Sequence, residues 1–396
     1  MTLAVMFAAQ FLSGMGFSFV LPFFPFYFRV LGVHDESGIL LWMGWSSAAF
    51  GAAMAVSAPL WGMAADRYGR KLMVVRSMFA GAVILGLMGL ARNPWHLLVL
   101  RITQGLFTGT VSASITLVSS VTPSAHLGMS LGILQTAFLL GSSAGPLLGG
   151  IISDHFGFRI PCGIASAMLF IGVVFVTVFA SETFNNNGND RHINLRTMHG
   201  IIRTRGFKLL LVTYFLVYVL NFMVIPVLPL FIEVLSGYAP NAVTLTGVIV
   251  SVTSFLAGLS ASAFGRLGDR LGPARVLVLS LVGVGLFAIP QSLAPTLPVF
   301  FIERCLMGIA IGGVLPSVHT LVSNTIPRDC VGGAYGLTAS VTCLGIGAGP
   351  LIGGYLASIM GLRVPFAVTG FLALGFAFLL NGAFAGKTPR AKSHTS

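Results

Sequence analysis

Long apolar runs follow one another along almost the whole chain, separated by short polar or glycine-rich breaks. A helix of about 20 apolar residues crosses the ~30 Å hydrocarbon core of a bilayer, so each run is long enough to span a membrane. The short alternating strands of a membrane barrel are not found, and lipid tolerates no unpaired backbone groups. The pattern therefore predicts twelve membrane-spanning helices, over residues 3–31, 39–64, 72–91, 95–120, 128–152, 159–181, 207–235, 243–265, 274–293, 297–322, 332–357 and 364–384.

Composition points to the same environment. Of the 396 residues, 56% are hydrophobic and only 8% are charged, and the mean hydropathy is +0.94. A soluble domain carries roughly 25% charged residues. The chain is therefore expected to be an all-α integral membrane protein that uses the lipid bilayer as its solvent.

One short polar pattern occurs twice, about half a chain apart. The first copy consists of Gly62, Asp66, Arg67, Gly69, Arg70 and Lys71, and the second of Gly265, Asp269, Arg270 and Gly272. Asp66 and Asp269 are 203 positions apart, and the G-P-L-L-G-G of 145–150 returns 204 positions later as G-P-L-I-G-G. Half-chain repeats in an apolar sequence are typical of transporters, with the substrate site between the repeats. The sequence therefore predicts two pseudo-symmetric six-helix bundles.

A single long polar stretch separates the two halves. Residues 183–206 are rich in asparagine and basic residues and cannot lie in lipid. The predicted organisation is an N-terminal bundle over 1–182, a cytoplasmic linker over 183–206, a C-terminal bundle over 207–386 and a cytoplasmic tail over 387–396. A solvated connector is the simpler interpretation of the linker, and a short helix on the inner membrane surface is the alternative.

The basic residues are distributed unevenly between the loops. The formal net charge is +12, and most of the 22 Lys and Arg residues fall on the side that holds residues 66–76, the linker and the C-terminal tail. Basic loops stay cytoplasmic, so both termini are expected to face the cytoplasm of a plasma (inner) membrane. This distribution also explains the high charge without a nucleic-acid partner, because the basic residues lie at helix ends.

Signatures of enzymes are absent from the sequence. The four cysteines form no C-x-x-C pair, and neither H-E-x-x-H nor a G-x-x-x-x-G-K-[ST] phosphate loop occurs. We therefore predict no catalytic residues, no metal and no cofactor. Without a site for ATP, an ion gradient or the substrate gradient must drive any transport.

Three motifs occur in the order, and on the helices, expected of one transporter family. They are the D-R-x-G-R-K loop, the R-x-x-Q-G stretch at 101–105 and the G-x-x-x-G-P-x-x-G-G helix at 141–150. The chain resembles a twelve-helix member of the major facilitator superfamily, and most closely its drug:proton antiporter branch. The likeness covers essentially the whole chain. It implies a small-molecule substrate, protons as the coupling ion and a monomeric protein.

In this family, the loop after the second helix couples the two halves. The resemblance gives that role to all the residues of the two loop copies, with Asp66 near a helix end and the basic residues bridging to the other half. The simpler explanation of Arg67, Arg70 and Lys71 is that they only fix the orientation of the chain in the membrane. The second copy is weaker, because Pro273 and Ala274 replace Arg70 and Lys71.

Proton coupling requires polar groups inside the membrane, and few are present. Arg101 and Arg304 fall within spans, where an ionised group costs at least ~2.5 kcal/mol, although both could instead extend to the outer headgroups. The family associates the arginine at position 101 with proton movement. Among the acidic residues, Glu303 is the best coupling candidate, and Glu233 is the second; the family's usual first-helix acid is missing. Glu233 lies 204 positions after Arg29, so the two are expected to meet as an outer gate.

Glycines and prolines mark two helices as close-packing elements. The first set is Gly141, Gly145, Pro146, Gly149 and Gly150, and the second includes Gly349 and Pro350. Small residues let neighbouring backbones approach, and packing alone explains the pattern. By resemblance, the first set is associated with antiport.

Helices one, four, seven and ten line the substrate cavity in the family. This analogy nominates Gln10, Tyr27, Gln104, Tyr214, Tyr218 and Asn221 as cavity residues. The sequence as a whole predicts a secondary transporter that exports small amphipathic molecules in exchange for protons by alternating access. An uptake or facilitative carrier for a polar metabolite and a non-transporting receptor are the alternatives.

Overall fold

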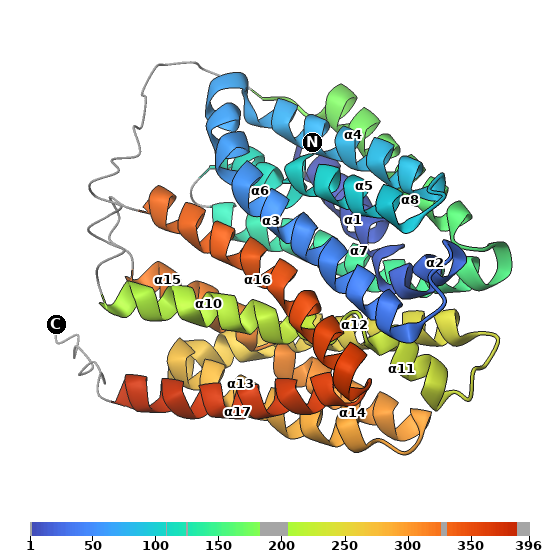
Figure 1. Ribbon diagram of the computed structural model, residues 1–396. Helices are drawn as coiled ribbons and strands as arrows, with labels where there is room; N and C mark the ends of the chain where they lie inside the picture. The colour runs from blue at the N-terminus through green and yellow to red at the C-terminus, as the bar shows by residue number, and fades with distance from the viewer. Residues whose placement is uncertain (1, 108, 124–125, 183–204, 326–330, 386–396) are drawn as a thin grey trace.

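The computed structural model describes residues 2–107, 109–123, 126–182, 205–325 and 331–385 (Figure 1). Within these ranges, the side chains at 66, 205–206, 323–325, 331–336 and 384–385 lie outside the described part. The described residues form helices and connecting turns without any strand. Residues 183–204 of the predicted linker (183–206) and the predicted tail at 387–396 fall outside the described residues, and Arg205, within the predicted linker, begins a helix.

Helices of the first half follow the predicted runs closely. They are α1 (Thr2–Ser18), η1 (Leu21–Phe23), α2 (Phe24–Val30), α3 (Glu36–Tyr68), α4 (Arg70–Gly89), α5 (Pro94–Phe107), α6 (Thr110–Val121), α7 (Leu127–Phe156) and α8 (Arg159–Phe179).

The second half repeats this order. Its helices are α10 (Arg205–Met223), α11 (Leu228–Leu235), α12 (Ala242–Leu271), α13 (Pro273–Leu293), α14 (Leu297–Ile311), α15 (Val314–Thr325), α16 (Val331–Met360) and α17 (Val364–Ala385).

Eleven segments of the described chain are long and apolar enough to cross a membrane. The remaining span, expected as one helix over 95–120, is divided into α5 and α6, and neither piece reaches the required length alone. Gly109 stands at the break with φ of +141°, a conformation that side chains with a Cβ avoid. The two pieces together form the twelfth span.

Three other expected helices are also divided. The first and seventh spans break around Pro22 and Pro226, which are 204 positions apart. The tenth span breaks at Gly312–Gly313, as the fourth does at Gly109. Proline lacks an N–H and glycine weakens a helix, so these breaks follow from residues that the sequence repeats.

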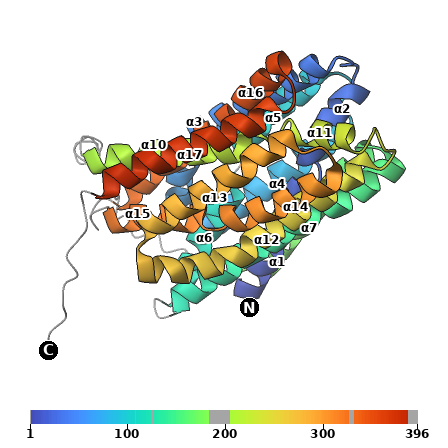
Figure 2. The same ribbon diagram turned by 90° about the horizontal axis from the view of Figure 1, so that it is seen from below.

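The two halves lie next to each other, with the blue-to-green helices on one side and the yellow-to-red helices on the other (Figure 1). Their long helices run roughly along a common direction (Figure 2). Because successive spans alternate in direction, the molecule has two ends. We call the end that holds Arg29, Gly157 and Gly361 the Arg29 end, and the end that holds Gly69 and Gly272 the Gly69 end.

Buried apolar side chains form two clusters. One contains the core of the first half and also includes second-half residues near the Arg29 end, namely Phe231, Val243, Ala294, Phe300, Ala357 and Phe366 among others. The other cluster belongs to the second half alone. The two halves therefore share a hydrophobic core toward the Arg29 end.

Candidate functional site

The α3–α16 contact joins the halves through glycines. A Cβ built at Gly51 would lie 2.6 Å from the carbonyl oxygen of Cys343, and one built at Gly354 would lie 2.5 Å from that of Leu40. Near the Arg29 end, the Ser37 hydroxyl donates to the Ser358 carbonyl at 3.2 Å. Only residues without a side chain allow two backbones to approach this closely.

A second contact between the halves is made by α7 and α12. Here Gly247 of α12 packs against the Pro146 carbonyl. Ser251 takes part twice: its carbonyl accepts a hydrogen bond from the Ser143 hydroxyl, and its hydroxyl accepts one from the Leu147 N–H, both at 3.0 Å.

The duplicated glycine–proline pattern serves two contacts in each half. Gly141 and Gly145 face the backbone of α1, and Gly149 faces the backbone of Phe19 just after it, all within the first half. Gly150 instead faces Val243 of the second half. In α16, Gly349 likewise faces α10 of its own half. The pattern is therefore a packing device that also lies at the boundary between the halves.

The Gly69 end lacks comparable close contacts in the described part of the chain. Nothing lies within 4 Å of a Cβ built at several glycines of the long helices there, namely Gly62, Gly128, Gly132, Gly258, Gly265 and Gly268. Ser143 and Ser251 are the last described hydrogen-bonded pair between α7 and α12 on the way to this end. The described halves are thus joined at the Arg29 end and apart at the Gly69 end.

The first loop copy is anchored within its own half. Gly69 turns the chain with φ of +94°. The Lys71 ammonium donates to the Thr177 carbonyl at 2.9 Å, and the Arg70 and Lys71 backbone N–H groups donate to the Glu182 carboxylate at 3.0 and 2.8 Å. The Asp66 side chain lies outside the described part. The bridge to the opposite half that the resemblance implies for Lys71 is replaced here by a contact with α8.

Glu182 was not identified from the sequence, where it counts only as a loop residue. Its carboxylate caps the N-terminus of α4, where backbone N–H groups have no helical partner. The second copy starts α13 with Pro273, which has no N–H to satisfy at that position. The one signal in the sequence is that the backbone N–H of Arg70 needs a partner at the start of its helix, whereas its counterpart Pro273 has no N–H.

Both membrane arginines are buried and do not extend to the headgroups. Each is 6% exposed. The Arg101 guanidinium donates to the Gln104 side-chain oxygen at 2.8 Å and lies over the ring of Phe50 at 4.5 Å from its centroid. Arg304 lies over the rings of Phe300 and Phe366, each at 5.7 Å. Each half thus holds one such cation against aromatic rings in its interior.

Glu303 lies beside Arg304 in sequence but forms no ion pair with it among the described residues. Its Oε2 is shielded from solvent and has no described hydrogen-bond partner. Gln291 of α13 donates to the Glu303 backbone carbonyl at 3.4 Å. A carboxyl group with no ion-pair partner in this environment is better suited to binding and releasing a proton than to forming a permanent salt bridge.

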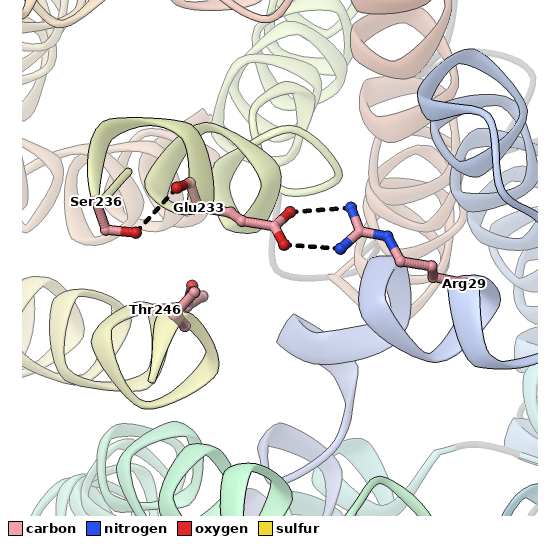
Figure 3. Close-up of polar contacts among 5 residues, drawn as sticks. Arg29, Glu233, Ser236 and Thr246 are labelled. Atoms are coloured by element: carbon pink, nitrogen blue, oxygen red, sulfur yellow. Dashed lines mark hydrogen bonds and ion pairs between the residues drawn. The ribbon is translucent and has the colours of Figure 1, made fainter. Parts of the chain in front are cut away.

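Glu233 does meet Arg29, as the 204-residue offset predicts. The two terminal guanidinium nitrogens of Arg29 donate to the two carboxylate oxygens of Glu233 at 2.7 and 2.9 Å, which makes a bidentate ion pair between α2 and α11 (Figure 3). This is the one ion pair between side chains in the described part of the chain.

The cavity candidates have different surroundings. In α10, the rings of Tyr214, Tyr218 and Phe222 lie nearly parallel at successive turns, 6.3 and 6.2 Å apart. The Tyr214 hydroxyl pairs with Nδ1 of His319 at 2.9 Å. Asn221 donates to a carbonyl of its own helix. These residues form an aromatic and polar row on the second half.

The first-half candidates are buried, as Tyr214 is in the second half. Gln10 is buried, and its side-chain oxygen has no described partner. Tyr27 is also buried, and its hydroxyl donates to the Met88 carbonyl at 2.7 Å. Tyr27 therefore ties α2 to the end of α4 in this conformation.

Arg76 is a half-buried cation that the sequence analysis counted only among the basic residues that set the orientation. Its guanidinium lies 3.4 Å from the centroid of the Trp61 ring, and the Trp61 N–H donates to the Leu106 carbonyl at 2.6 Å, beside the break between α5 and α6. The equivalent position of the second half, 203 residues later, holds Leu279.

Comparison with known proteins agrees with this architecture. The family model described as Major Facilitator Superfamily matches residues 6–257 and 210–396. The chain belongs to the Major Facilitator Superfamily. It is a multi-pass membrane protein of a family of transporters, with a small-molecule substrate.

Curated relatives within this superfamily share a third of the sequence. The chain is 34% identical over 373 residues to the multidrug resistance protein MdtG of Salmonella arizonae, covering 94% of this chain and 92% of that protein. It is also 34% identical over 384 residues to MdtG of Proteus mirabilis, covering 96% and 95%.

Solved structures share the superfamily fold at low sequence identity. The nucleoside transporter NupG has a TM-score of 0.76 at 14% identity, covering 98% of this chain and 100% of that one. A bacterial homolog of the human lysosomal transporter Spinster, in an inward-facing and unoccupied conformation, has a TM-score of 0.76 at 16% identity, covering 98% of each chain. The human organic anion transporter MFSD10 has a TM-score of 0.72 at 19% identity, covering 96% and 98%.

Proposed function

We propose that this chain exports small amphipathic, drug-like molecules in exchange for protons, by alternating access. The observation that carries this proposal is the 34% identity to multidrug resistance proteins over nearly the full length of both chains. The absence of a phosphate-binding motif for ATP from the sequence is consistent with an ion gradient as the energy source.

Orientation follows from the positive-inside rule. The Gly69 end carries the basic loop at 67–71 and the approach to the basic linker, so we assign it to the cytoplasm, together with both termini. The Arg29 end is then external. Under this assignment the two halves are in contact on the external side and separated on the cytoplasmic side. This is the state in which an exporter binds its substrate from the cytoplasm. We propose a monomer as the working unit and the polar segment at 183–206 as the linker between the bundles.

Substrate would bind between the halves. The row formed by Tyr214, Tyr218 and Asn221 supplies aromatic surface and a few polar groups, and Gln10 and Gln104 supply amides on the first half. A site with this composition suits flat or amphipathic molecules of varied structure better than sugars, because few fixed polar groups restrict what binds.

Protons would move through the buried polar groups of the spans. We assign Glu303 as the first coupling candidate, because one oxygen of its carboxyl, Oε2, is shielded from solvent and has no hydrogen-bond partner within the described residues. Arg101 and Arg304 hold positive charge inside the bundles, where it acts on a neighbouring proton site over several ångströms. Glu233 is the second carboxyl candidate, although its pairing with Arg29 favours a structural role. All the residues of the two loop copies are assigned to conformational coupling.

The test is accumulation of lipophilic dyes in efflux-deficient cells that express the chain, with and without a protonophore. We expect lower dye accumulation, restored by the protonophore and by Glu303→Gln but not by Glu36→Gln, an exposed carboxylate outside the proposed sites. Export that survives Glu303→Gln moves the coupling site to another group. Accumulation above that of cells without the chain contradicts export and supports an uptake carrier.

A further inference from the structure

Two carboxylates reach across the boundary between the halves at the Arg29 end, one from each half. Glu233 of the second half binds Arg29 of the first. Asp154 of the first half accepts a hydrogen bond at 2.7 Å from the Thr244 backbone N–H of the second. Neither carboxylate belongs to a repeated motif of the sequence.

The Glu233–Arg29 contact is a bidentate, charge-assisted ion pair (Figure 3). The side chain of Glu233 is 12% exposed and that of Arg29 is 37% exposed, so the pair is partly withdrawn from water. Charge-assisted hydrogen bonds with this parallel geometry are stronger and more directional than neutral ones. A fully exposed pair would contribute little, whereas partial burial makes the loss of one partner costly for the other.

Asp154 acts on a helix end. Thr244 lies in the first turn of α12, where backbone N–H groups lack helical partners and the helix dipole favours a negative charge. The cap is supplied in trans, by α7 of the other half. At the equivalent place between α3 and α16, position 358 is a serine, and the contact is a neutral hydrogen bond of 3.2 Å from Ser37. One of the two helix pairs thus carries a charged contact, and the other a weaker neutral one.

These contacts differ in kind from the glycine packing around them. Glycine packing consists of many individually weak, non-directional contacts, so a rocking movement loses them one after another along the helices. The two carboxylates must instead exchange a protein partner for water when the Arg29 end opens. The free-energy cost of breaking these two contacts therefore falls on the step in which the Arg29 end opens.

We propose that Glu233 and Asp154 are positioning residues that together hold the external side of the transporter closed. They form a reciprocal lock, in which each half contributes the carboxylate that binds a positive group of the other half. The inference rests on the proposed alternating access with the Arg29 end external. It adds that the balance between the two access states is set by these two contacts.

The experiment measures the opening directly. Spin labels are attached to cysteines that replace Arg92 and Thr296, two exposed loop residues at the Arg29 end that lie 204 positions apart, in a chain whose four native cysteines are replaced by alanine. Pulsed electron paramagnetic resonance on the purified protein in lipid vesicles gives the distribution of distances between the labels. The variants are Glu233→Gln, Arg29→Gln, Asp154→Asn, the charge exchange Arg29→Glu with Glu233→Arg, and the control Lys208→Gln, an exposed residue near the start of α10.

We expect the unaltered lock to give mainly the short distance. Glu233→Gln and Asp154→Asn should each raise the ratio of long to short distances about five- to tenfold. The charge exchange should restore the short distance, which a merely disruptive substitution would not do. Asp154→Asn keeps the shape and one acceptor oxygen, so it reports on charge with little risk to folding.

The proposal is wrong if the distance distributions of Glu233→Gln and Asp154→Asn match that of Lys208→Gln. The role given to the Arg29–Glu233 ion pair is also wrong if the charge exchange gives the same distance distribution as the single variants of Arg29 and Glu233. Dye export by the same chains separates this outcome from a failure of the proposed function. Wild-type export together with unchanged distances refutes the lock alone, and absence of wild-type export refutes the function whatever the distances are.

Discussion

The Arg29 end and the Gly69 end are built from the same repeated helices, yet they pack differently. Toward the Arg29 end the halves share one buried cluster, close glycine contacts and hydrogen bonds. At the Gly69 end the glycines of the same helices face open space, and the described contacts of the loop stay within the first half. Small residues along both ends of a helix permit either end to close. The asymmetry therefore reflects the conformation and not the composition of the helices.

The largest expected effect contrasts two glycines of α12. Gly247→Leu places a side chain against the Pro146 backbone, while nothing lies within 4 Å of a Cβ at Gly258. Overpacking of a tight backbone contact costs about 1–3 kcal/mol or more, because backbone cannot yield as a side chain can. We expect Gly247→Leu to lower the melting temperature of the purified protein severely and Gly258→Leu to change it little.

A second outcome concerns what Gly258→Leu does to transport. If the Gly69 end closes during the cycle, Gly258→Leu should slow export while leaving the melting temperature near that of the wild type. Equal melting temperatures for the two variants would contradict the contrast between the ends.

The two loop copies at the Gly69 end provide the next comparison. Lys71 and the N–H groups of Arg70 and Lys71 are anchored to α8 and Glu182, whereas the second copy has Pro273 and Ala274 at those positions. Asp66→Asn is therefore expected to slow export about tenfold and more than Asp269→Asn does. Initial rates of dye export at matched expression measure the difference. Equal rates in the two variants would remove the functional distinction between the copies.

A smaller effect is expected from the Glu182 cap. Glu182→Ala leaves the N-terminus of α4 without its two charged hydrogen bonds, and loss of a cap costs about 1 kcal/mol. The melting temperature should fall by a few degrees, and Glu182→Gln should recover part of the loss. Lys208→Ala, an exposed residue near the start of α10, is the control. A fall of the same size in the control would show that the cap contributes nothing specific.

The smallest effect is expected at the boundary hydrogen bonds. Ser143→Ala removes a single neutral bond to the Ser251 carbonyl, worth about 0.5–1.5 kcal/mol. We expect a small rise in the long distances between labels at 92 and 296, below the rise for Asp154→Asn. A larger rise for Ser143→Ala would mean that neutral contacts, and not the carboxylates, control opening.

Much of the fold could be predicted from the sequence because its causes are local or repeated. Apolar length defines the spans, and the 203–204 offset predicts the two halves and the meeting of Arg29 with Glu233. The division of the fourth span at Gly109 was missed, since one glycine in an apolar run has no fixed conformational consequence. Interaction of Glu182 with the start of α4 was missed for another reason, because a cap from 112 residues away leaves no local pattern.

Candidate site residues could be predicted in type more often than in role. Arg101 and Arg304 are recognisable from sequence as costly charges in spans, but the headgroup alternative is excluded only by their burial among Phe50, Phe300 and Phe366. Tyr27 shows the converse. The resemblance places it in the cavity, while its bond to Met88 holds it within the first half in this conformation.

The sequence by itself determined the membrane environment, the twelve spans and the two-fold repeat, because hydrophobic length and periodicity act residue by residue along the chain. Tertiary structure alone decided which end of the two halves is closed, that Asp154 caps a helix of the opposite half, and that Glu303 and Arg304 do not pair among the described residues. These facts depend on how rigid helices far apart in the sequence are placed against each other. That placement is a balance between two nearly equivalent packings of one repeat, and no local pattern records which packing is adopted.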